Sequence, residues 1–168
     1  MKTRSRSAIF VICLFAFSFL VLTPAFAGGY TNALKGVNGI KALFSVSNGS
    51  AKMLNIVFWA VRNAYEDDAV KALPEKPQVA LVFYGPAVKL LSADHSNLKG
   101  EELAELVKFQ DTLKQMKKDG VKLEVCLYAA KVMGVNPATI LPEIDQVGNG
   151  FISVIGYQQQ GYAVVEVP

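Results

Sequence analysis

The sequence is poor in the residue types that carry catalytic chemistry, with two cysteines and one histidine among 168 residues. No group of cysteine, histidine and acidic residues has the spacing of a metal site. A glycine-rich phosphate-binding fingerprint is also missing, because Asn48-Gly49-Ser50 lacks the further glycines that such a loop needs. We therefore expect no metal ion and no cofactor.

The N-terminal segment has the pattern of a secretory signal peptide. Three basic residues among the first six precede an apolar stretch over 8–22, and Pro24-Ala25-Phe26-Ala27 follows. The apolar stretch is shorter than the roughly 20 residues of a membrane-spanning helix, and the small residues Ala25 and Ala27 suit signal peptidase. We predict cleavage near Ala27, after residues 1–27, and a periplasmic or secreted protein. An uncleaved N-terminal anchor is the alternative.

Cleavage at this point would leave a chain without an excess of positive charge. It would remove three of the 17 basic residues, so that 14 remain, as many as the 14 acidic residues. We therefore expect no nucleic-acid partner and, after cleavage, no contact with the membrane. The remaining residues suit one domain, with a flexible leader over 28–38 and an α/β domain over 39–168.

Cleavage would also remove Cys13 and leave Cys126 as the single thiol. That excludes an internal disulfide, and it excludes a dithiol oxidoreductase, which needs a second cysteine to resolve a mixed disulfide. A cysteine protease would need a base, but the only histidine, His95, lies in a polar stretch that predicts a solvated loop. A single cysteine can instead carry a group, since a persulfide needs no resolving partner within the chain.

Apolar stretches of two periods alternate along the chain. Short, mainly apolar stretches predict strands at Ile40–Val46, Val79–Tyr84, Val121–Cys126 and Tyr162–Val167. A further short strand is expected at Glu143–Val147. Helical spacing predicts helices at Ser50–Leu73, Glu101–Lys118, Tyr128–Met133 and Gly150–Gln160. Strands that alternate with helices need right-handed crossovers, which place helices on both faces of the sheet. The sequence predicts a three-layer α/β/α sandwich with a five-stranded, mainly parallel sheet.

The helix that begins at Ser50 is apolar on more than one side. Its expected core stripe consists of Met53, Ile56, Val57, Ala60, Val61 and Ala64. Four further apolar residues lie outside that stripe: Leu54, Phe58, Trp59 and Tyr65. A helix with one side exposed to solvent does not need these further apolar residues, so we expect a second contact such as a subunit interface.

Ligands of open parallel sheets bind at the carboxyl ends of the strands. Three loops qualify: residues 47–50, residues 84–87, and the residues that follow Cys126. We expect these loops to share one edge of the sheet and to form a pocket around Cys126. The predicted lining residues are Asn48, Tyr84, Gly85, Pro86, Leu127 and Tyr128.

Cys126 itself has two interpretations. If a helix begins near Leu127, the free N–H groups at its N-terminal end stabilise a thiolate, which is the reactive form of cysteine. Alternatively, Cys126 is a small core residue at the end of a buried strand, because unpaired cysteine is among the most buried residue types. By contrast, Phe151 and its neighbours are expected to form an ordinary amphipathic helix.

Several segments resemble the DsrE/DsrF-like proteins, which include sulfur-relay subunits of the TusD type. They are Val125-Cys126-Leu127, Met133-Gly134-Val135, Gly150-Phe151-Ile152, Gln159-Gln160-Gly161-Tyr162-Ala163-Val164 and, similar to a loop after the second strand, Tyr84-Gly85-Pro86-Ala87-Val88-Lys89-Leu90-Leu91. The resemblance implies a five-stranded parallel fold, assembly into trimers or hexamers, and a cysteine at position 126 that accepts and passes on sulfur as a persulfide. Tyr84 stands where many relatives have histidine, and Ala87 where many have glycine.

The leading hypothesis is therefore a periplasmic sulfur carrier with Cys126 as its nucleophile. Its partners would be sulfur donor and acceptor proteins or small thiols. One alternative is a non-catalytic module that binds a small ligand while Cys126 is buried and inert. A purely oligomeric scaffold is the other alternative.

Overall fold

The computed structural model describes residues 29–168. The predicted signal peptide and Cys13 lie outside the described residues. Among residues 29–168, no helix has the length and apolar character needed to cross a membrane.

Five strands form one sheet in the order β4-β3-β2-β1-β5, and every pair of neighbours is parallel. The strands are β1 (Lys41–Val46), β2 (Gln78–Phe83), β3 (Lys122–Cys126), β4 (Asp145–Val147) and β5 (Ala163–Val167). The helices are α1 (Ala51–Glu66), α2 (Asp68–Lys71), α3 (Gly100–Lys118), α4 (Leu127–Val132) and α5 (Gly150–Gln159), with 3-10 helices η1 (Gly85–Leu91) and η2 (Pro137–Thr139). The predicted α/β fold with a five-stranded sheet is confirmed, and the sheet is parallel throughout.

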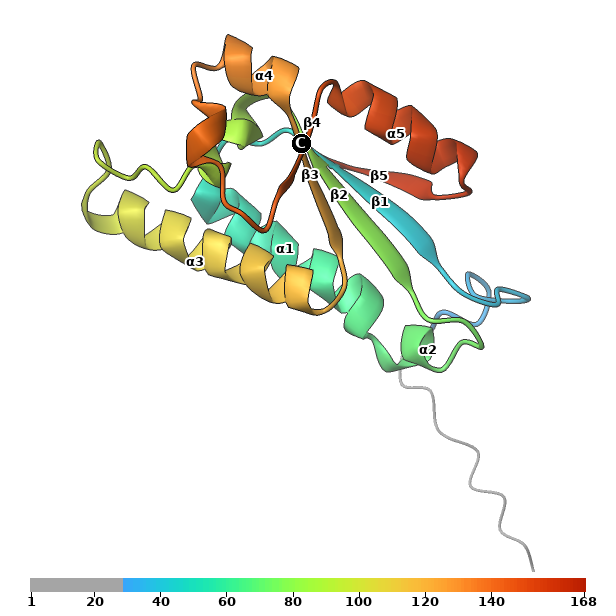
Figure 1. Cartoon of the computed structure of the whole chain (residues 1–168). Coiled ribbons are helices and arrows are strands. Elements are labelled where there is room, and N and C mark those ends of the chain that lie inside the picture. The colour runs from blue at the N-terminus through green and yellow to red at the C-terminus, as the bar shows by residue number, and fades with distance from the viewer. Residues whose placement is uncertain (1–28) are drawn as a thin grey trace, which may run out of the picture.

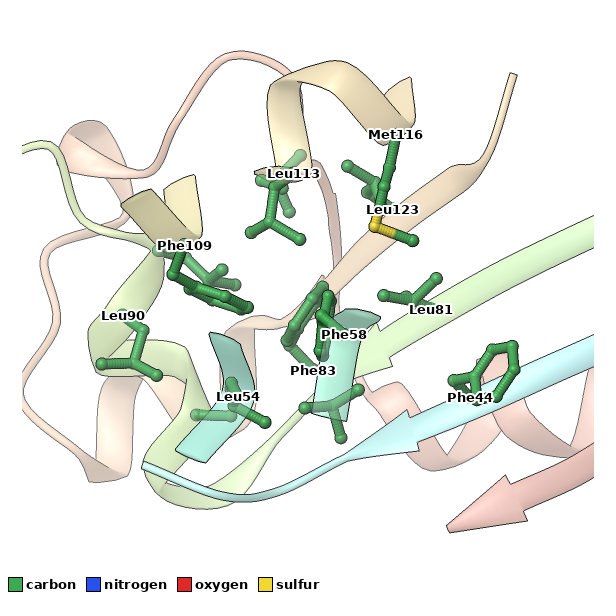
Figure 2. Close-up of a cluster of buried hydrophobic side chains, with 14 of the residues drawn as sticks. Phe44, Leu54, Phe58, Leu81, Phe83, Leu90, Phe109, Leu113, Met116 and Leu123 are labelled. Atoms are coloured by element: carbon green, nitrogen blue, oxygen red, sulfur yellow. The ribbon is translucent and has the colours of Figure 1, made fainter. Parts of the chain in front are cut away.

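Helices cover both faces of the sheet, as Figure 1 shows, with α1 and α3 on one face and α5 on the other. The larger core lies under α1 and α3, where Phe58 and Phe109 pack edge to face with ring centroids 4.9 Å apart (Figure 2). A smaller cluster lies under α5 and consists of Leu43, Ala80, Val82, Tyr157 and Tyr162. Alternate side chains of β1 and β2 therefore serve different cores, which explains why β2 is an unbroken apolar stretch.

The single helix predicted over Ser50–Leu73 is wrong, because the chain forms two helices there. Helix α1 ends at Glu66, and Asp67 adopts an extended backbone that cannot continue the helix. The carboxylate of Asp67 then accepts a hydrogen bond from the Ala69 N–H at 2.8 Å and caps α2. An aspartate that offers the backbone this local acceptor favours a helix start over a helix interior.

The predicted core stripe of α1 is also wrong for three of its six residues. The buried residues of α1 are Ala51, Leu54, Phe58, Val61 and Tyr65. Of the predicted stripe, Met53, Ile56 and Ala60 are exposed. Trp59, which lies outside that stripe, is 76% exposed. Both sets have helical spacing, but the buried set places two aromatic rings in the core, where they remove more apolar area from water.

Tyr65 gives the fold a predicted sensitivity to alkaline pH. Burial, followed by the charge of Asp119, raises the pKa of Tyr65 from 10.0 to about 12, and the Tyr65 hydroxyl donates to the Asp119 carboxylate at 3.2 Å. A raised pKa in the folded state means that stability is complete below pH 10 and falls as the pH rises toward 12. Urea unfolding across this range is expected to show that fall, with a smaller slope in Tyr65→Phe. An unchanged slope in the variant would contradict the assignment to Tyr65.

Candidate functional site

The carboxyl ends of all five parallel strands lie at one edge of the sheet, and the C-terminus of the chain lies there too (Figure 1). Cys126 is the last residue of β3 and the residue that precedes α4. Its Sγ accepts a hydrogen bond from the Ala129 N–H at 3.4 Å, in the position of a helix cap. The cysteine therefore lies where a strand ends and a helix begins.

Cys126 points to the face of the sheet that α5 covers. Leu123 and Val125 belong to the core under α1 and α3, and strand alternation directs Cys126 to the opposite side. The residue is 5% exposed, so the thiol is enclosed on most sides.

The start of α5 passes close to Cys126, and this passage depends on a glycine. A Cβ atom on Gly150 would lie 2.9 Å from the Cys126 Cβ and 3.2 Å from the Val82 Cγ1. Both distances are shorter than ordinary carbon contacts, which are about 3.5–4.0 Å. Gly150 thus allows the first turn of α5 to approach the cysteine.

A cavity of about 340 Å³ opens beside the cysteine. Its size is at the lower end of the range typical of small-molecule sites. Nine residues line it, and none is a lysine, arginine, histidine, aspartate or glutamate: Tyr84, Gly85, Cys126, Tyr128, Ala129, Val132, Met133, Asn149 and Phe151. The cavity is therefore mainly apolar and aromatic, with a thiol in its wall.

Tyr84 is held in the wall of the cavity by two contacts. Its hydroxyl accepts a hydrogen bond from Ser45 Oγ at 3.0 Å. Its ring packs edge to face with Phe151, with centroids 5.6 Å apart. Gly85 follows with a φ of +53°, a conformation that other residues adopt only with strain, and this turn leads the chain from β2 into η1.

The structure places three of the six predicted lining residues, Tyr84, Gly85 and Tyr128, around the cavity with Cys126. It places the other three outside the set of lining residues. The Asn48 side-chain amide donates a hydrogen bond to the Pro168 carbonyl at 2.7 Å, which ties the loop after β1 to the C-terminus. The Asn48 side-chain oxygen accepts a hydrogen bond from the Ser50 N–H at 2.8 Å.

Pro86 and Leu127 have structural contacts of their own. A Cβ atom on Gly49 would lie 2.8 Å from the Pro86 Cβ, so these two loops pack tightly against each other. Leu127 packs against the larger core.

The main omission of the sequence-based prediction is the loop that follows β4. Asn149 and Phe151 line the cavity, although Phe151 was expected to belong to an ordinary amphipathic helix. Asn149 caps α5 by accepting a hydrogen bond from the Phe151 N–H at 3.0 Å. The rule that ligands bind at the carboxyl ends of parallel strands applies to β4 as well, so it could have included this loop.

His95 takes no part in the cavity. Its Nε2 lies 3.0 Å from the Gln110 Oε1, and Gln110 is buried and donates to the carbonyls of Leu90 and Ser92. Because the Gln110 amide nitrogen already donates, its oxygen accepts from His95, which ties the polar loop to α3. Within the described part of the chain, no three cysteine, histidine or acidic side chains are grouped to hold a metal ion.

The sequence model of the DsrE/DsrF-like family matches residues 41–167 of this chain, a range that includes all five strands. A search of curated proteins found no match.

Several solved structures share the fold. A protein of unknown function from Methanobacterium thermoautotrophicum is 18% identical, with a TM-score of 0.59 over 76% of this chain and 99% of that chain. A conserved protein of unknown function from Bacteroides thetaiotaomicron is 16% identical, with a TM-score of 0.54 over 81% and 100%. The ychN protein from E. coli is 12% identical, with a TM-score of 0.53 over 76% and 99%. At these identities the likeness shows a shared fold.

Proposed function

Because the chain belongs to the DsrE/DsrF-like family, we propose that it is a sulfur carrier that accepts sulfur on Cys126 as a persulfide and passes it on. The observation that carries the proposal is the place of the Cys126 thiol, in the wall of a cavity at the carboxyl edge of the sheet. A thiol at such a place can meet a small donor without a second cysteine in the chain.

The proposed reaction is an exchange between two thiols, without net oxidation. The Cys126 sulfur attacks the outer sulfur of a donor persulfide, R–S–SH, and a new S–S bond forms while the donor S–S bond breaks. The donor sulfur leaves with the electron pair and takes up a proton, and the Cys126 proton passes to solvent. The products are R–SH and a Cys126 persulfide, and the same exchange in reverse delivers the outer sulfur to an acceptor thiol.

The residues around Cys126 have defined parts in this proposal. The Ala129 N–H that bonds Sγ is placed to stabilise negative charge on the sulfur during the exchange. Gly150 leaves room beside the cysteine for the approach of α5. Tyr84 and Phe151 form an aromatic wall of the cavity.

Export and assembly belong to the same proposal. DsrE/DsrF-like proteins are often oligomeric. Met53, Ile56 and Trp59 of α1 are exposed and apolar, and so are Ile152 and Ile155 of α5, which are surfaces that a trimer or hexamer would cover. We place the mature protein in the periplasm or outside the cell. Light scattering on the purified protein tests the assembly, and a monomer would contradict it.

The low exposure of Cys126 favours a second candidate function. A residue that is 5% exposed is enclosed enough to be inert, and the cavity would then bind a small ligand without chemistry. The two candidates differ in whether sulfur becomes attached to the thiol.

The proposal predicts a gain in mass when the protein meets a persulfide donor. After incubation, the protein cleaved after Ala27, in which Cys126 is the single thiol, should be heavier by one sulfur atom, and a reducing agent should remove it. Cys126→Ser should fold, because serine is a favourable residue before a helix, and it should lose the gain. No gain in the wild type, or a gain that persists in Cys126→Ser, would refute the carrier function.

A further inference from the structure

We infer that the cavity beside Cys126 selects sulfur compounds whose organic group is small, apolar and uncharged, such as alkyl or aryl persulfides and polysulfides, over compounds with an anionic group. The inference rests on the proposed function and names the substrate class of the same site. Thiosulfate and glutathione persulfide represent the excluded class, because each carries negative charge that has to enter the cavity or remain at its mouth.

The wall of the Cys126 cavity carries no charged side chain. None of its nine lining residues is a basic residue. A sulfonate or carboxylate that enters would lose water and gain no cation, which is unfavourable. A second cavity of about 830 Å³ differs in this respect, since charged residues of both signs line it: Lys52, Lys89, Lys99, Glu101, Glu102 and Glu105. The charged side chains of that cavity lie outside the Cys126 cavity.

Backbone N–H groups near the cavity are the donors that an anion could use in place of a basic side chain. The start of α5 would attract an anion, but two of its N–H groups already have partners. The Phe151 N–H donates to the Asn149 side chain and the Ile152 N–H to the Asn149 carbonyl, both at 3.0 Å. The Ala129 N–H bonds the Cys126 sulfur itself. These three N–H groups are thus occupied within the protein.

The size and the apolar lining of the cavity suit an apolar group. A volume of about 340 Å³ accommodates a small molecule. The edge-to-face pair of Tyr84 and Phe151 and the side chains of Val132 and Met133 offer apolar contact. Each buried methylene group adds about fourfold to affinity when its transfer free energy is converted to an equilibrium constant.

Two thiol reagents of similar length that differ in charge test the inference. Propyl methanethiosulfonate is uncharged, and 2-sulfonatoethyl methanethiosulfonate is anionic and similar in length, while both attach to cysteine through a disulfide. Rates at Cys126 are read by peptide mass spectrometry, which separates Cys126 from Cys13, in the native chain and in urea. We expect the ratio of uncharged to anionic rate to be at least about tenfold higher in the native chain. An equal ratio, or a faster anionic reagent in the native chain, would overturn the inference.

A pair of variants ties the selectivity to the cavity. Val132 lines the cavity and is 65% exposed, so polar replacements should leave the fold intact. Val132→Lys should accelerate the anionic reagent relative to the uncharged one, and Val132→Gln, which is polar without charge, should not. Equal behaviour of the two variants would contradict selection by charge.

Sulfur transfer separates this inference from the proposed function. An alkyl persulfide should load Cys126 faster than thiosulfate or glutathione persulfide does. Equal loading by all donors would overturn the inference and leave the carrier function standing. No loading by any donor would refute the carrier function, and with it the substrate class, even if the reagents show the expected selectivity.

Discussion

Replacing Gly150 with alanine is expected to lower the free energy of unfolding by about 1–3 kcal/mol. The new Cβ would lie 2.9 Å from the Cys126 Cβ and 3.2 Å from the Val82 Cγ1, so α5 or β3 has to move. Gly150 and Cys126 are both buried, which leaves little free space for that movement. Urea denaturation of the two proteins measures the difference.

Gly156→Ala is the matched control for this prediction. Gly156 also belongs to α5, and no atom lies within 4 Å of the position that its Cβ would take. Alanine in a helix is favoured over glycine by roughly 0.5–1 kcal/mol, so this variant should be more stable than the wild type. The opposite signs of the two effects identify close packing against Cys126 as the cause. A Gly150→Ala variant as stable as Gly156→Ala would mean that α5 does not lie against the cysteine as described.

The architecture was predictable because it depends on patterns that extend over many residues. The five strands appear within about two residues of the predicted bounds, since all except β4 are compact, mainly apolar stretches bounded by turn residues. The break at Asp67 was not predictable from periodicity, because apolar residues recur across it as Tyr65 and Val70. The side chain of Asp67 caps the new helix at this point, and the spacing of apolar residues contains no sign of a capping side chain.

The buried side of α1 illustrates a second limit of sequence reasoning. Met53 and Ile56 are three residues apart and Leu54 and Phe58 are four apart, and both spacings place a pair on one side of a helix. The pattern alone therefore allows either stripe to face the sheet. Packing decides between them, since Phe58 meets Phe83 and Phe109 from β2 and α3. Those contacts join segments that are far apart in the sequence.

The candidate site was predictable at the level of loops and less so at the level of side chains. The edge of the sheet followed from the parallel topology, and with it the neighbourhood of Tyr84, Gly85 and Cys126. The turn of the chain after β4 and the small size of Gly150 bring Phe151 to the cavity, and these features depend on three-dimensional packing. Asn48 lies at the predicted edge, but its hydrogen bonds tie it to the C-terminus.

The rate at which native Cys126 reacts with iodoacetamide shows whether this thiol faces the cavity, as the proposed function requires. A thiol in the cavity wall should react in the native chain within about tenfold of its rate in the urea-unfolded chain, because only local motion is needed. A sealed thiol would react only when the chain opens, and a stability of about 5 kcal/mol would slow it roughly a thousandfold or more. Peptide mass spectrometry reads Cys126 separately from Cys13. A rate within tenfold supports the account, and a thousandfold protection would contradict it.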